Sequence, residues 1–199
     1  MTGLAGLGLA GGKGDPIPVA AAGERGVCAS PLRVDDYPMA REIREHAETA
    51  EWVNALPAPD GESLVRLLES RRRAGRLLLL SIVGNDGAFL GEILLFVRTP
   101  EAAETDTGEI AYIVAPAARG RGIATEAVRL LSLWALAGLG LQRLQLTIRP
   151  GNVSSIRVAE KAGYRLEGTL RSVKVIRGKR VDGSLYSLLP EDVAAGASR

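Results

Sequence analysis

The sequence predicts an α/β fold, of the α+β kind, in which one mixed, mostly antiparallel sheet of six to seven strands carries helices on both faces. Short runs of strand-forming residues alternate with amphipathic helical segments. Their order, β-α-α-β-β-β-α-β-α-β-β, is typical of a single layered domain. One strand also leads through a glycine-rich loop directly into a long helix. The 199 residues are enough for one such domain and its core.

Composition divides the chain into three segments. Residues 1–29 are rich in glycine and hold little apolar surface to bury, so we expect a flexible amino-terminal extension. Residues 30–189 contain all the periodic segments and form the folded domain. Residues 190–199 are expected to be a loose carboxy-terminal tail.

Local signals place the individual elements. Asp35 or Asp36 caps the first helix, and Asp60 or Ser63 begins the second, because short polar side chains accept hydrogen bonds from the first helical amides. Residues 84–87 form a hairpin turn. The expected elements are a strand at 32–34, a helix near 37–45, an irregular segment at 48–59, a helix from 60 or 63 to about 75, strands at 76–83 and 88–97, a polar loop at 99–107, a strand at 109–114, a helix from 123 to about 136, a strand at 143–148, a helix at 154–161, and strands at 164–176 and 179–188.

The loop between the strand at 109–114 and the helix at 123–136 is the centre of the functional interpretation. Gly120 and Gly122 have no Cβ, so the backbone turns sharply there and a ligand can approach closely. The first amides of the helix have no intrahelical partner and favour an anion, above all a phosphate. The loop lacks the Gly-Lys-Ser/Thr of a Walker loop and the glycine spacing of a dinucleotide fingerprint. A plain glycine-rich turn with two solvated arginines stays open as the alternative.

Two motifs resemble one known family. Arg119-x-x-Gly122-x-Ala124 resembles the acyl-CoA pyrophosphate loop of the GNAT superfamily of N-acyltransferases, Gln/Arg-x-x-Gly-x-Gly/Ala. The stretch from Asn152 to Tyr164 resembles the Asn-x-x-Ser-x-x-Val-x-Glu-Lys-x-Gly-Phe/Tyr signature of the branch that includes the ribosomal-protein-alanine N-terminal acetyltransferases. The resemblance extends from about residue 30 to about residue 189. It implies the GNAT fold, acetyl-CoA as the cofactor, and transfer of the acetyl group to a primary amine.

The same resemblance assigns the cofactor contacts. It puts the pyrophosphate on the loop amides, and the pantetheine arm in a gap between the strands at 109–114 and 143–148, where an amide would also stabilise the thioester oxyanion. Asn152 would meet the arm or its bridging water, besides capping a helix. Lys161, with Arg157, would reach the 3′-phosphate, although a solvated helix face is the alternative. The predicted cofactor-binding residues are Ile113, Val114, Arg119, Gly120, Arg121, Gly122, Ile123, Ala124, Thr125, Asn152, Ser155 and Lys161.

Transfer to an amine requires a base and a proton donor. The acceptor ammonium must lose a proton before it attacks. We favour Glu109, which begins the strand that feeds the cofactor loop, at a position where this branch often carries an acid; Glu92 on the neighbouring strand is the rival. Ser155 occupies the family's serine position and is expected to donate to the leaving thiolate. The alternatives are an exposed strand carboxylate and a first-turn serine that bonds its own backbone. Core packing is the default expectation for Tyr112 and Tyr164, and lining the site is the alternative for each.

Composition limits the partners. The net charge of +2 disfavours nucleic acid, no apolar run is long enough for a bilayer, and the single Cys28 suits a reducing compartment, so we expect a cytoplasmic protein. One histidine and one cysteine give no reason to predict a metal site. The expected acceptor is a protein N-terminus or an amine-bearing small molecule. A homodimer is expected through the last hairpin, with Val173, Val175 and Ile176 exposed, since relatives in this branch often pair.

Two alternative functions remain open at this point. One is an acyl-CoA-binding module without turnover, in which the carboxylate does not reach the acceptor. The other is an acyltransferase that uses a different acyl-CoA or an aminoacyl-tRNA. The modest charge disfavours tRNA, which would favour a basic stripe.

Overall fold

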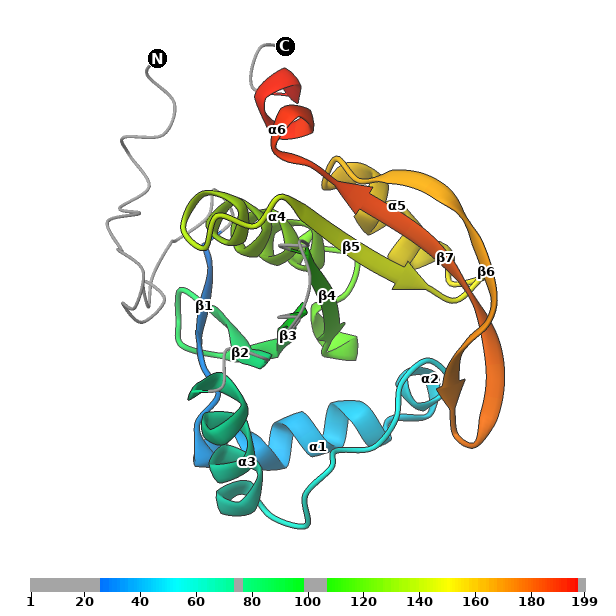
Figure 1. Ribbon diagram of the computed structural model, residues 1–199. Coiled ribbons are helices and arrows are strands. Elements are labelled where there is room, and N and C mark those ends of the chain that lie inside the picture. The colour runs from blue at the N-terminus through cyan, green and yellow to red at the C-terminus, as the bar shows by residue number, and fades with distance from the viewer. Residues whose placement is uncertain (1–25, 74–76, 99–106, 197–199) are drawn as a thin grey trace.

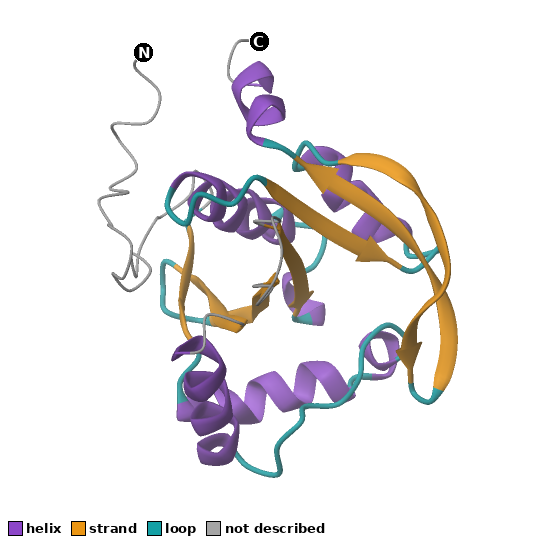
Figure 2. Cartoon of the chain, in the orientation of Figure 1, coloured by secondary structure: helices purple, strands orange, loops and turns teal. Residues whose placement is uncertain are grey.

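The computed structural model describes residues 26–73, 77–98 and 107–196 of the chain. Seven strands form one sheet in the order β1-β2-β3-β4-β5-β7-β6 (Figures 1 and 2). All neighbouring strands are antiparallel except β4 and β5. This confirms the predicted mixed, mostly antiparallel sheet. The strands are β1 (Val27–Pro31), β2 (Leu77–Gly84), β3 (Phe89–Arg98), β4 (Thr107–Val114), β5 (Arg143–Ile148), β6 (Arg165–Ile176) and β7 (Lys179–Leu188).

Helices cover both faces of this sheet (Figure 1). They are α1 (Tyr37–Glu45), α2 (Ala47–Ala50), α3 (Gly61–Arg73), α4 (Ile123–Ala137), α5 (Val153–Lys161) and α6 (Pro190–Gly196), with short 3-10 turns at Val34–Asp36 and Pro116–Ala118. Helices α4 and α5 pack on one face over the larger core, which includes Ile93, Ile110 and Leu146. Helices α1 and α3 pack on the other face over a smaller core, which includes Ala40, Leu64 and Leu79.

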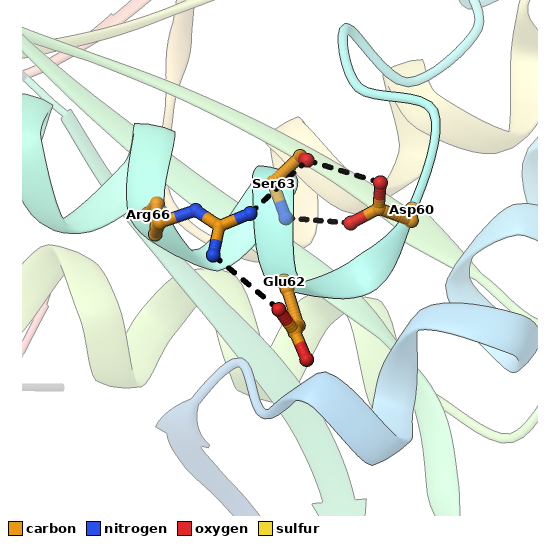
Figure 3. Close-up of polar contacts among 4 residues, drawn as sticks. All are labelled: Asp60, Glu62, Ser63 and Arg66. Atoms are coloured by element: carbon orange, nitrogen blue, oxygen red, sulfur yellow. Dashed lines mark hydrogen bonds and ion pairs between the residues drawn. The ribbon is translucent and has the colours of Figure 1, made fainter.

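The start of α3 shows how local chemistry places a helix (Figure 3). The Asp60 carboxylate accepts hydrogen bonds from the Ser63 amide at 2.8 Å and the Ser63 hydroxyl at 3.0 Å. One of the first helical amides, which have no intrahelical partner, is thereby satisfied. Arg66 pairs with Glu62 one turn earlier at 3.3 Å. Asp60 is therefore the cap, one of the two residues that the sequence offered.

The first strand and the carboxy-terminal segment differ from expectation. The strand lies at 27–31 rather than 32–34, because Val27 is buried and pairs with β2 while Arg33 and Val34 are exposed. Helix α6 forms where a loose tail was expected, and Val193 packs against the larger core. The expected extension lies outside the described residues up to residue 25, as does most of the polar loop at 99–107. Within the described part of the chain, no helix has the length and apolar character required to cross a membrane.

Candidate active site

Strands β4 and β5 separate near the middle of the sheet (Figure 1). Their parallel pairing covers only Thr107–Glu109 on β4 and Arg143–Gln145 on β5. Beyond it, β4 continues along β3 up to Val114, whereas β5 continues along β7 up to Ile148. Within the described residues, the facing edges of the two strands therefore have no sheet partner. Such a fork can take an extended ligand as an added strand.

The register decides which main-chain groups face this fork. The Ala115 amide donates to a β3 carbonyl at 2.8 Å, and a Cβ added to Gly91 would lie 2.2 Å from the Ile113 carbonyl oxygen. The Ile113 carbonyl therefore faces β3. Because polar groups alternate along an antiparallel strand, those of Tyr112 and Val114 face the fork. Of the two main-chain positions expected to meet the cofactor, Val114 faces the fork, whereas the Ile113 carbonyl faces β3.

The glycine loop has the shape of an anion site. Gly120 and Gly122 have φ angles of 74° and 81°, which cost other residues roughly 1–2 kcal/mol. The first intrahelical bond of α4 runs from the Glu126 amide to the Gly122 carbonyl at 3.1 Å. The preceding helical amides, those of Ile123, Ala124 and Thr125, therefore have no intrahelical partner. They point toward the loop and fit a pyrophosphate.

The two loop arginines have different surroundings. The Arg119 guanidinium contacts the Glu48 carboxylate at 2.6 Å, donates to the Thr49 hydroxyl at 2.7 Å and donates to the Val114 carbonyl at 3.2 Å. It fastens the loop to α2 and to the end of β4. Arg121 is exposed. Of the two side chains, Arg121 is thus the one available to a phosphate.

The first turn of α5 forms one wall of the fork. The Asn152 side-chain oxygen accepts a hydrogen bond from the Ser155 amide at 3.1 Å, so Asn152 is the helix cap. The Tyr112 hydroxyl donates to the Ser155 carbonyl at 3.3 Å. Burial raises the pKa of Tyr112 to about 12, and its hydrogen bond to Ser155 opposes this only in part. Tyr112 therefore stays protonated at neutral pH. Tyr164, by contrast, is buried in the core and bonded to the Ser132 hydroxyl at 2.8 Å, as core packing predicted.

Lys161 lies at the opposite end of α5 from Asn152, about 13 Å away along the helix axis. Its carbonyl accepts a hydrogen bond from Arg129 of α4, and its side chain is exposed. Arg157, on the same helix, is also exposed. Arg157 and Lys161 are four residues apart and therefore share one side of α5.

Glu92 is fully buried beneath α1. Its side chain has no exposed surface, and its Oε2 atom contacts Arg44 Nε at 2.8 Å and Arg44 Nη2 at 2.7 Å. Its Oε1 atom has no hydrogen-bond partner among the described residues. Burial raises the pKa of Glu92 and outweighs the opposite effect of the Arg44 charge. Glu92 pairs with Ile113, so β4 lies between the Glu92 backbone and the fork.

Glu109 lies where the fork closes, as the last β4 residue that pairs with β5. Its side chain is 17% exposed, and Lys174 Nζ contacts its Oε1 atom at 3.1 Å. The same Nζ donates to the Thr147 carbonyl at 3.1 Å, so Lys174 joins β6 to both arms of the fork. Glu92 pairs with Ile113, and Glu109 is four residues from Ile113 on the same strand. The carboxylates of Glu92 and Glu109 therefore project from the same face of the sheet. That face is the one covered by α1.

Two residues of this arrangement have no role in the sequence-based interpretation. Arg44 binds a carboxylate 48 positions away, and Lys174 reaches Glu109 from a different hairpin, so neither shows a local signal. Tyr112 lies at the fork, where its hydroxyl contacts Ser155.

The fold agrees with the comparisons. The chain belongs to the acetyltransferase (GNAT) domain family, because the model of that family matches residues 27–165. It is 36% identical over 108 residues to "Probable N-acetyltransferase YjcK" of Bacillus subtilis, which covers 54% of this chain and 59% of that protein. The chain spans about half the length of the curated relatives it matches.

Solved structures give the same fold. RimJ of Mycobacterium smegmatis, in complex with CoA-disulfide, superposes with a TM-score of 0.74 at 26% identity, over 85% of this chain and 89% of that chain. The spermidine N-acetyltransferase of Vibrio cholerae, in complex with CoA and spermine, has a TM-score of 0.71 at 16% identity, over 85% and 98%. The second likeness concerns the fold alone.

Proposed function

We propose that this protein is an N-acetyltransferase that transfers the acetyl group of acetyl-CoA to a primary amine, on a protein N-terminus or a small molecule. One observation carries the proposal: the fork between β4 and β5 opens beside a glycine-rich helix start and holds a half-buried carboxylate at its closed end. The first two features suit an acyl-CoA, and the third suits an amine that must lose a proton.

The residues that would hold acetyl-CoA come from three elements. The amides from Arg119 to Thr125 receive the pyrophosphate, with Arg121 adding charge. The main chain of Tyr112 and Val114 receives the pantetheine arm, and Asn152 borders it. When bound, acetyl-CoA supplies an acetyl thioester at the fork. A main-chain amide at the fork would stabilise negative charge on the thioester oxygen.

Glu109 is our proposed base. Its carboxylate is partly exposed on the face under α1, and Lys174 fixes one of its oxygens at 3.1 Å. This carboxylate can take a proton from an acceptor ammonium, directly or through one water. Glu92 is fully buried and held by Arg44, so an acceptor cannot contact it without moving α1. We propose that Glu92 positions α1 on the sheet.

Ser155 is our proposed donor to the leaving thiolate. Its amide is held by Asn152 and its carbonyl by Tyr112, so the first turn of α5 is fixed against the fork. A hydroxyl in this turn can donate to a developing anion. The neutral Tyr112 hydroxyl supports that position from β4.

A thiol-release assay tests the proposed function. Acetyl-CoA is mixed with the protein and a panel of N-terminal peptides, polyamines and other primary amines, and free CoA is followed. We expect acceptor-dependent release together with an acetylated product by mass spectrometry. Acetyl-CoA binding without acetylation of any amine would instead indicate a binding module. Release only with a longer acyl-CoA would indicate a different donor.

We also propose a cytoplasmic homodimer that pairs through β6. This strand is an edge of the sheet, and most of its residues are exposed. Its exposed apolar side chains include Leu166, Leu170, Val173 and Val175. A long apolar edge strand readily pairs with another chain, which a second copy would satisfy symmetrically. Light scattering at micromolar concentration should give the dimer mass, and a monomer mass would refute it.

A further inference from the structure

The turn end of the β6–β7 hairpin is strongly basic. Between residues 170 and 182 there is one acidic side chain, Asp182, and its Oδ1 atom already accepts a hydrogen bond from the Ser172 amide at 2.8 Å. The other charged side chains of this segment are cations. Lys174 is half-buried, and the rest are exposed. These cations are Arg171, Lys174, Arg177, Lys179 and Arg180.

Asn54 fixes this basic turn beside α2, as Figure 1 shows for the two segments. Its side-chain nitrogen donates to the Val175 carbonyl at 3.1 Å, and its side-chain oxygen accepts from the Arg177 amide at 3.0 Å. The Asn54 carbonyl also accepts a hydrogen bond from Arg44 at 3.4 Å. One amide side chain thus joins the hairpin to the segment after α2, across the face that carries Glu109.

Strand register shows which cations face this space. Lys174 points toward the fork, because its Nζ atom contacts Glu109. Ile176 pairs with Lys179 and lies two residues further along β6, so both share the face of Lys174. Arg180 pairs with Val175 and projects from the opposite face. An acceptor that extends from the Glu109 carboxylate along this face of the hairpin therefore meets Lys179, with Arg177 at the turn.

We propose that this surface selects acceptors whose amine is followed by negative charge, namely acidic peptide N-termini, and disfavours polyamines. The proposal rests on the proposed function and names its acceptor class. Arg177 at the turn is three residues from Lys174, which corresponds to about 10 Å of extended strand. A peptide whose amine meets Glu109 therefore places roughly its second to fourth residues beside Arg177 and Lys179. A polyamine would place ammonium groups there, against like charge.

The test compares acceptors on the full-length protein at fixed acetyl-CoA. Three peptides share the first residue and differ at positions 2–4, which are Asp/Glu, Gln or Lys; spermidine is the fourth acceptor. The variant is the double substitution Arg177→Glu and Lys179→Glu. The matched control is Arg66→Glu with Arg71→Glu, which reverses two exposed charges on α3, away from the hairpin.

We expect the acidic peptide to have the highest kcat/KM. The hairpin variant should lower it about three- to thirtyfold, because two exposed charge contacts are lost, and should raise the value for the Lys peptide. The control should leave the order unchanged. Raising the salt to 0.5 M should shrink the difference between peptides, because exposed charges are then screened. If the double variant misfolds by circular dichroism, Arg177→Gln with Lys179→Gln should give the same direction with a smaller effect.

The inference fails if the three peptides react equally, or if spermidine is the best acceptor. It also fails if peptides are not distinguished while an oligonucleotide binds and loses affinity in the hairpin variant, which would assign the surface to nucleic acid. If no amine of any charge is acetylated, the proposed function itself fails.

Discussion

The Tyr112 hydroxyl on β4 donates a 3.3 Å hydrogen bond to the Ser155 carbonyl on α5, across the place where β4 and β5 part. Among the described residues, β4 and β5 are not paired beyond Glu109 and Gln145. The Tyr112 side chain therefore joins β4 to α5, the helix that follows β5, across the fork. The main-chain N–H and C=O groups of Tyr112 also face the fork. Tyr112 therefore connects the proposed pantetheine site to the proposed thiolate donor.

Replacing Tyr112 with Phe should remove the hydrogen bond to the Ser155 carbonyl and keep the packing of the ring. One net hydrogen bond is worth about 1 kcal/mol, or about fivefold in an equilibrium or rate. We expect kcat to fall about fivefold for Tyr112→Phe, and less than additively when it is combined with Ser155→Ala. The control is Tyr164→Phe, which loses the core hydrogen bond to Ser132 and should lower stability without changing kcat. Equal kcat losses in both single variants would contradict the connection.

The glycine loop should depend on backbone conformation rather than on space alone. Gly122 has a φ of 81°, so Gly122→Val strains the loop and adds bulk where a pyrophosphate would approach. We expect acetyl-CoA binding by calorimetry to be abolished. Gly140→Val is the matched control, since Gly140 has a φ of 72° and lies after α4, away from the loop. Unchanged affinity in Gly122→Val, or equal loss in both variants, would move the cofactor site elsewhere.

Much of the fold follows from local patterns. Helix α1 and strand β5 begin and end where the sequence predicts, because each has its own periodicity and turn residues. The sequence predicts β1 five residues too late, at 32–34, because the position of this strand depends on pairing with β2 rather than on a local signal. Pairing between distant strands is not visible in a single sequence.

The backbone geometry of the candidate site was predictable only where a glycine or a cap defines it. The left-handed φ of Gly122 and the capping contact of Asn152 depend on residues close to them in the chain. The orientation of Ile113 depends on its register with β3. Lys174 contacts Glu109 from β6, and the β6–β7 register that places it there is irregular between Leu170 and Lys174, which no local signal in the sequence indicates.

The Arg143–Glu167 pair should give the protein a specific acid sensitivity. Both Arg143 nitrogens contact the two Glu167 oxygens at 2.8 and 2.6 Å, and the Ser187 hydroxyl donates to the same carboxylate at 2.6 Å. These contacts lower the pKa of Glu167 to about 2. The carboxylate therefore stabilises the fold fully above pH 4.5, and this stabilisation is lost as the pH falls toward about 2.

Urea titrations of Glu167→Gln check this dependence. Because the Glu167 side chain is 40% exposed, solvent screening limits the expected loss at pH 7 to about 1 kcal/mol in the free energy of unfolding. The difference from the wild type should shrink below pH 4.5 and vanish near pH 2. Glu62→Gln, in an exposed pair on α3, should cost only about 0.3–0.5 kcal/mol at pH 7. A difference for Glu167→Gln that grew on acidification would be incompatible with the lowered pKa.

The two carboxylates under α1 should separate in their pH–rate profiles. A general base acts only when deprotonated, so the rate rises with pH through its pKa, and losing the base typically costs about 10²–10⁴-fold. Glu109→Gln should therefore lower kcat by that amount, remove the acidic limb and leave acetyl-CoA affinity nearly unchanged. Ser155→Ala should cost about ten- to hundredfold, because a hydrogen bond to a charged group is worth about 1.5–3 kcal/mol, and should keep that limb.

Glu92→Gln should keep the acidic limb and change stability instead. It leaves the Arg44 side chain, which is 11% exposed, next to a neutral partner. The raised pKa of Glu92 means that the folded wild type holds this proton more tightly than the unfolded chain. The free energy of unfolding of the wild type therefore decreases as the pH rises above 4.5 toward the folded pKa, and Glu92→Gln should lack this decrease. If Glu92→Gln instead removes the acidic limb while Glu109→Gln keeps it, Glu92 is the base. If neither removes it, the amine loses its proton through water, and Glu109 is a structural partner of Lys174.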